Sequence, residues 1–93
     1  MTALEEFDRL RDEGGAKLSM IAREWGDASE FCRRCVELWQ RRVTEAFVSL
    51  SHRDVENARA HLERGLHVLT FGPEVARRER LALDEVVTLM NAL

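Results

Sequence analysis

Two cysteines three residues apart, in Cys32-Arg-Arg-Cys35, form the pattern in this chain that is best suited to chemistry. A C-x-x-C pair can act as a redox couple or supply half of a zinc site. A redox pair gains its low thiol pKa at a helix N-terminus, whereas these cysteines follow the first turn of a predicted helix and share a face with Trp39. A zinc site needs further ligands, and no histidine stands at a suitable spacing from Cys35. We therefore expect two buried, reduced packing residues.

The same pair leaves one alternative function open. Cys32 and Cys35 could bind a metal across a subunit interface, or respond to oxidation there with the flanking arginines lowering their thiol pKa. The chain would then be a metal- or thiol-responsive regulator whose assembly depends on metal.

The other polar side chains give no catalytic pattern. His61 and His67 lie six residues apart, which on a helix turns them to opposite flanks of an apolar stripe, so one chain cannot bind a metal with both. Residues 49–54 crowd two serines, a histidine and an aspartate into one turn, but no nucleophile-elbow sequence or glycine-rich oxyanion loop accompanies them. We expect no enzyme, and we predict no catalytic residue, no cofactor and no metal site.

The elements that position these residues are helices. Apolar residues recur at three- and four-residue spacing in four stretches, residues 2–25, 28–50, 52–71 and 74–93. The turns between them are short, so neighbouring helices should be antiparallel. The sequence predicts an all-α fold: a single domain, residues 1–93, folded as an antiparallel up-down bundle of four helices.

Two glycines, Gly14 and Gly65, lie on or beside the predicted apolar stripes. The Gly14-Gly15 pair costs about 1 kcal/mol per glycine inside a helix, so it either breaks the first helix or marks a close approach of another helix. The apolar phase continues through it without a shift and favours one continuous helix. The alternative is three helices with a short N-terminal helix. The stripes that should face the core include Leu4, Phe7, Leu18, Ile21, Trp25, Phe31, Phe47, Val55, Ala58, Leu62, Leu66, Leu69, Val75, Val86, Leu89 and Leu93.

Capping residues place the predicted helix ends. The starts are assigned to three pairs, Thr2 with Glu5, Asp27 with Glu30, and Ser51 with Asp54. Gly26 fits a C-terminal cap. Gly72-Pro73 would separate the last two helices and place Pro73 in a first turn, where its missing N–H costs nothing.

The length and charge of the chain limit the functions that it can have. A chain of 93 residues has a thin core, so a partner or a second copy that extends the core is expected. The formal net charge of −3 argues against nucleic-acid binding. No apolar run approaches the roughly 18 residues of a membrane-spanning helix, and the acidic start lacks the features of a secretory signal. We expect a cytoplasmic protein that binds neither nucleic acid nor membranes.

Two groups of side chains are predicted to bind a partner. Thirteen of the fourteen basic residues are arginine, whose forked guanidinium suits carboxylates, and several are clustered in the second stretch. Apolar residues also stand away from the main stripes, where exposed patches usually mark interfaces. The predicted partner-binding residues are Val48, Val68, Phe71, Arg33, Arg34 and Arg41. We therefore expect a small helical protein-protein interaction module, an adaptor or chaperone-like protein that self-associates or holds a partner helix, similar in composition to the co-chaperones of bacterial secretion systems.

Overall fold

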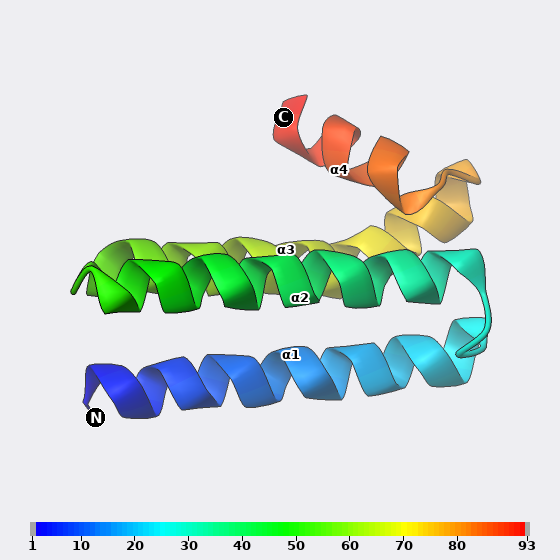
Figure 1. Ribbon diagram of the computed structural model, residues 1–93. Helices are drawn as coiled ribbons and strands as arrows, with labels where there is room; N and C mark the ends of the chain where they lie inside the picture. Colours follow the sequence, from blue (N-terminus) through cyan, green and yellow to red (C-terminus); the bar gives the residue numbers. More distant parts are fainter. Residues whose placement is uncertain (1, 93) are drawn as a thin grey trace.

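The computed structural model describes residues 2–92, which form four α-helices and no strand. Helix α1 spans Ala3–Trp25, α2 spans Glu30–Ser51, α3 spans Val55–Glu79 and α4 spans Leu83–Ala92. Consecutive helices run in opposite directions along the molecule (Figure 1). The predicted all-α up-down bundle of four helices is therefore confirmed. Within the described residues, no helix is both long enough and apolar enough to cross a membrane.

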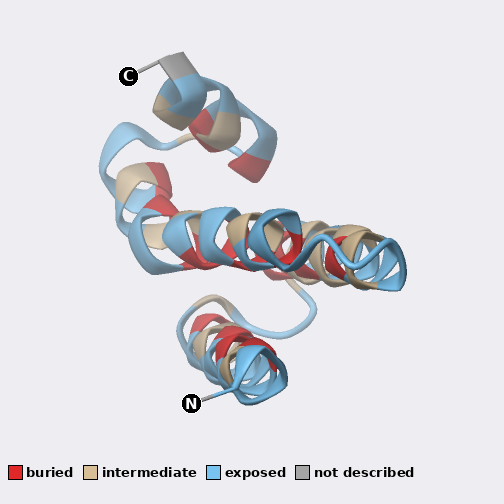
Figure 2. Cartoon of the chain, turned by 90° about the vertical axis from the view of Figure 1, so that its left-hand side faces the viewer, coloured by how far each residue is buried: buried red, intermediate tan, exposed pale blue. Residues whose placement is uncertain are grey.

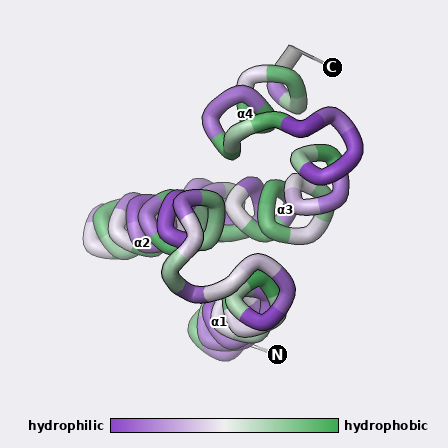
Figure 3. Tube along the Cα trace, turned by 90° about the vertical axis from the view of Figure 1, so that its right-hand side faces the viewer, coloured by the Kyte–Doolittle hydropathy of each residue, from purple (hydrophilic) through white to green (hydrophobic). Residues whose placement is uncertain are grey.

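The helices are arranged in three layers. Helices α2 and α3 pack against each other most extensively and form the central layer. Helix α1 packs on one side of this pair and α4 on the other, so that α1 and α4 do not touch (Figures 1 and 3). Buried residues line the sides of the helices that face a neighbour (Figure 2). The core is consequently spread over two interfaces instead of one central seam.

The indole of Trp39 lies between two glycines in the larger interface. A Cβ atom on Gly14 of α1 would overlap Cζ2 and Cε2 of the indole, and a Cβ atom on Gly65 of α3 would lie 2.9 Å from Cε3 and Cζ3. Trp39 itself is buried. The predicted close approach at both glycines is confirmed, and the uninterrupted helix α1 shows that the three-helix alternative was wrong. The helix tolerates Gly14 because the absent side chain makes room for the tryptophan.

Two predicted ends of the first helix are confirmed. The hydroxyl of Thr2 accepts the backbone N–H of Glu5 at 3.1 Å. At the other end Gly26 adopts a positive φ of 85° and its N–H donates to the carbonyl of Ala22 at 2.9 Å. A side chain would strain this backbone conformation, which explains the choice of glycine.

The caps predicted for the second and third helices are wrong by two or three residues. Ser29, and not Asp27, caps α2, because its extended backbone lets Oγ accept the N–H three residues further on at 3.1 Å. Asp54, and not Ser51, caps α3 through Oδ1, also at 3.1 Å. Ser51 is instead the last residue of α2, and its hydroxyl donates to the carbonyl of Val48 at 2.7 Å.

The predicted turn at Gly72-Pro73 is also wrong, because α3 continues through both residues to Glu79. A proline clashes with the Cβ of a helical residue before it, and Gly72 has none. Continuation also buries Ala76. The last turns of α3 bend out of the line of the helix, as expected for an internal proline (Figure 1). The chain turns at Arg80, whose φ of 56° is left-handed, so α4 begins at residue 83 instead of 74.

Four residues predicted to face the core are exposed instead, one of them Val55 at the start of α3, which is 43% exposed. Leu4 in the first turn of α1 is 66% exposed, and Leu89 lies on the outer side of the short helix α4. Phe47 lies half exposed at the edge between α1 and α2, where its ring meets the ring of Phe7 edge-on at 5.2 Å. Residue 93 lies outside the described residues. The apolar stripes are therefore wider than this bundle buries.

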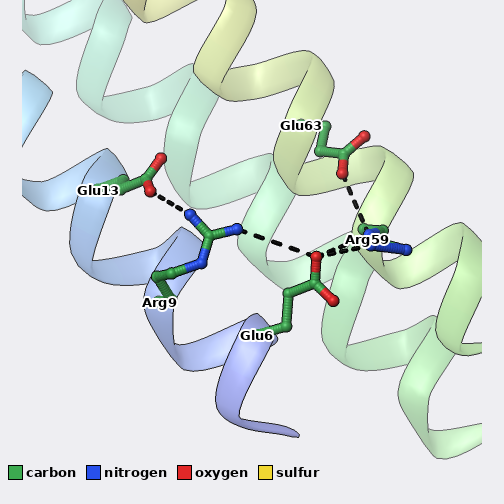
Figure 4. A network of polar contacts seen from close by, with 5 residues as sticks. All are labelled: Glu6, Arg9, Glu13, Arg59 and Glu63. Atoms are coloured by element: carbon green, nitrogen blue, oxygen red, sulfur yellow. Dashed lines mark hydrogen bonds and ion pairs between the residues drawn. The ribbon is translucent and has the colours of Figure 1, made fainter. Parts of the chain in front are cut away.

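A polar network ties the start of α1 to α3 at the surface (Figure 4). The carboxylate oxygen Oε1 of Glu6 accepts hydrogen bonds from Nε and Nη2 of Arg59 at 3.0 and 2.7 Å. Arg9 bridges Glu6 and Glu13, and Glu63 lies 3.2 Å from Arg59. Most of these side chains are half exposed, so we assign the network a small share of the stability.

Candidate protein-binding groove

A groove of about 310 Å³ lies where the C-terminal end of α4 meets the central pair of helices. We call it the α4 groove. Its apolar floor comes from all three helices that meet there, with Leu38 of α2, Val68 of α3, and Val87 and Met90 of α4. All four side chains are partly buried and pack against the core. The floor therefore offers apolar surface that the chain itself does not fully cover.

The rim of the α4 groove is mainly basic. Arg42 lies on the α2 side, and Arg64 and His67 lie on the α3 side. Arg42 is engaged within the chain, because its guanidinium lies 3.6 Å from the carboxylate of Glu45 and 3.1 Å from Nδ1 of His61. Arg64 is exposed and forms no ion pair with any other residue of the described chain. The rim thus carries a guanidinium that is available to a partner.

Phe71 stands beside this groove. It lies one turn after His67, and the two rings are 5.0 Å apart with a tilt of 58°. The Phe71 side chain is 53% exposed, so about half of a large apolar residue faces solvent. Partly exposed aromatic residues next to an apolar groove are typical anchors of protein interfaces.

A second, smaller hollow of about 160 Å³ follows the seam between α2 and α4. Leu38 and Val87 line both hollows, so the two lie next to each other. Arg34, Arg41 and Asp84 stand around the smaller one. The nearby carboxylate of Asp84, followed by those of Glu37 and Glu30, raises the pKa of the Arg34 guanidinium.

The predicted partner-binding residues are only partly brought together. Val68, Arg34 and Arg41 line the two hollows, and Phe71 stands beside them through its contact with His67. Val48 does not belong to this surface: it is 54% exposed near the end of α2. Arg33 is also exposed, pairs with Glu30 and lines neither hollow.

Sequence reasoning missed Met90, Arg64 and His67. Arg64 and Val68 are four residues apart on α3, as are His67 and Phe71, so each pair shares a helix face. That spacing could have extended the predicted patch toward the N-terminus of α3. Met90 could not have been found, because its place depends on the late start of α4.

A separate apolar surface lies at the edge between α1 and α2. Phe47 is 48% exposed, and the guanidinium carbon of Arg11 lies 5.3 Å from its ring centroid and 5.9 Å from that of Phe7. Cation–π contacts of this kind are worth about 0.5–1 kcal/mol at exposed sites. Because Arg11 covers part of both rings, the chain itself covers more of the apolar surface at this edge than in the α4 groove.

The cysteine pair lies in the core. Cys32 is 3% exposed and Cys35 is fully buried, and both are free thiols. Burial, with a smaller contribution from the neighbouring Cys32, raises the pKa of Cys35 to about 12. Cys35 is thus in the unreactive thiol form at neutral pH. Within residues 2–92, no three side chains of histidine, cysteine, aspartate or glutamate are grouped so that they could hold a metal ion.

No protein-family model matches this chain, and the comparisons with curated proteins and with solved structures give no match.

Proposed function

We propose that this protein is a helical protein-interaction module, an adaptor or chaperone-like protein, that holds a helix of a partner protein in the α4 groove. The observation that carries the proposal is the apolar floor of Leu38, Val68, Val87 and Met90, which three helices build and none covers. A groove of this kind fits the apolar face of an amphipathic helix. The protein would act by binding, without catalysis.

The lengths of the helices support this proposal. At about 1.5 Å per residue, the ten residues of α4 extend over roughly 15 Å, whereas the 25 residues of α3 extend over roughly 37 Å. Helix α4 therefore occupies less than half of the face that α2 and α3 present on its side. The α4 groove lies beside the last turns of α4, next to the part of this face that α4 leaves open.

Self-association is the second form of the same proposal, with a second copy supplying the helix. The thin core predicted from the chain length favours it. The proposal also places the protein in the cytoplasm, which fits two cysteines held as free thiols.

Photo-crosslinking in the cells that produce the protein tests the site of binding. Benzoylphenylalanine replaces Phe71 beside the groove or, as the matched control, Phe47, which is also a half-exposed phenylalanine with one aromatic neighbour. We expect an adduct at position 71 that maps to a helix of one defined protein or of a second copy, and none at position 47. An adduct at position 47 alone would move the binding surface to the edge between α1 and α2.

Sedimentation velocity at low micromolar concentration tests self-association. We expect a species larger than the 10.7 kDa monomer, reduced to monomer by Phe71→Asp but not by Phe47→Asp, with helical circular dichroism unchanged in both. A monomer at every concentration, together with no adduct at position 71, would contradict the proposal.

The metal- or thiol-responsive regulator stays a prediction that these experiments also test. It needs Cys32 and Cys35 at a subunit boundary, but both lie in the core of the single chain. Repeating the sedimentation run with a chelator separates the two functions. Only the regulator predicts that assembly is lost when metal is removed.

A further inference from the structure

We infer that the α4 groove selects an acidic amphipathic helix, one that carries carboxylates beside its apolar stripe. The inference rests on the proposed function and adds the chemistry of the partner. Two independent observations carry it: the way in which α4 itself is docked, and the two arginines beside the apolar floor that have no ionic partner among residues 2–92.

Helix α4 is an acidic amphipathic helix docked on the same face. Its ten residues include Asp84 and Glu85 and no lysine or arginine. Two of its own side chains, Leu83 and Val86, are buried, and Val86 packs close to Gly72 of α3. Asp84 stands beside Arg34 in the hollow between α2 and α4. The chain thus already shows which kind of helix this face accepts: apolar side chains against the floor and a carboxylate toward an arginine of α2.

Two further arginines beside the apolar floor repeat this chemistry. The ion pairs within the chain engage Arg34 with Glu30 and Glu37, but among residues 2–92 none engages Arg41 or Arg64. Arg41 lies on the α2 side and Arg64 on the α3 side of the apolar floor.

Within residues 2–92, no acid around the two hollows forms an ion pair with either arginine. Of the two acids beside Arg41, Glu37 lies 3.3 Å from Arg34, and Asp84 raises the pKa of Arg34. Glu63, the acidic residue that lines the α4 groove, lies 3.2 Å from Arg59 and is paired with it. Guanidinium groups bind carboxylates with two parallel hydrogen bonds, which favours a helix with glutamate or aspartate on both flanks of its stripe. A helix flanked by lysine would meet like charges on both sides.

Three designed peptides test the selection. Each is about 18 residues long, carries the same leucine and alanine stripe and a fluorescein label, and differs only in having glutamate, glutamine or lysine on both flanks. Fluorescence anisotropy measures their binding to the intact protein at low and at high salt. We expect the glutamate peptide to bind most tightly, the lysine peptide least, and the preference to shrink as salt rises.

Charge-reversal variants locate the effect. Arg41→Glu and Arg64→Glu should each weaken binding of the glutamate peptide by about fivefold, and the double variant should favour the lysine peptide. The matched control is Arg23→Glu on α1, which changes the net charge equally at an exposed arginine remote from the groove. Circular dichroism confirms that each variant keeps its helical content.

The outcomes separate this inference from the proposed function. Equal binding of all three peptides would overturn the acidic selection while leaving helix binding in place. If Arg23→Glu weakened binding of the glutamate peptide as much as Arg64→Glu does, the acidic selection would be overturned as well, because net charge alone would then explain the effect. Absence of binding by every peptide would also overturn it, and the crosslinking at position 71 would still decide the proposed function independently.

Discussion

Replacing Gly14 by alanine should destabilise the fold, although helix propensity alone predicts the reverse. In an isolated helix this change stabilises by about 1 kcal/mol. Here the new methyl group would overlap the indole of Trp39, which cannot retreat because Gly65 lies against its other edge. Overpacking of this kind costs typically about 1–3 kcal/mol, and a ring held from both sides belongs at the upper end. We expect a net loss of about 2 kcal/mol, equivalent to roughly 8–16 °C in Tm for a domain of this size.

Gly15 provides the matched control. It is the next residue of the same helix, it is exposed, and a Cβ atom there would meet nothing within 4 Å. Gly15→Ala should therefore stabilise the protein by up to about 1 kcal/mol. Urea unfolding followed by circular dichroism at 222 nm measures both variants. A Gly14→Ala protein as stable as the parent, or more stable, would refute the tight packing of Trp39.

Three further predictions concern single groups. Burial holds Cys35 as a neutral thiol, so the free energy of unfolding should fall as pH rises from about 9 toward the folded pKa of about 12. Cys35→Ala should reduce the slope of this pH dependence. Labelling of the thiols with Ellman's reagent should be slow until urea unfolds the chain. Asp54→Ala should cost about 1 kcal/mol of unfolding free energy and Ser51→Ala much less, and equal losses would contradict the cap observed at α3. Glu6→Gln should cost less than about 1 kcal/mol, and the difference should vanish near 1 M NaCl; a loss that persists in salt would show that its contact with Arg59 is not screened.

The fold class could be predicted from the sequence because helical periodicity is a local property. The continuity of α1 through Gly14 followed from the unbroken apolar phase, and the close approach at Gly65 followed from its place beside a stripe. The course of α3 through Pro73 could not be predicted this way. A proline after glycine usually marks a turn between helices. Here the burial of Ala76 and the packing of α4 over Gly72 outweigh the lost backbone hydrogen bond.

Only part of the candidate site could be predicted from the sequence. Leu38, Val68 and Val87 lie off the main stripes, and the structure gathers them in the α4 groove. Which off-stripe residues meet depends on where the last turn falls, and this turn lies eight residues later than Gly72. For the same reason the sequence could not separate Val48, which lies apart from the groove, from Val68.

The packing of Trp39 between Gly14 and Gly65 limits how the helices can slide past one another. Apolar stripes are repetitive, so a shift of one helical turn, about 5.4 Å, often exchanges one set of apolar contacts for another at little cost. In this chain a shift of α1 by four residues would bring Leu10 or Leu18 against the indole in place of Gly14. The same shift of α3 would bring His61 or Leu69 there in place of Gly65. Neither side chain fits the space, so one ring wedged between two bare backbones fixes the axial register of three helices at once.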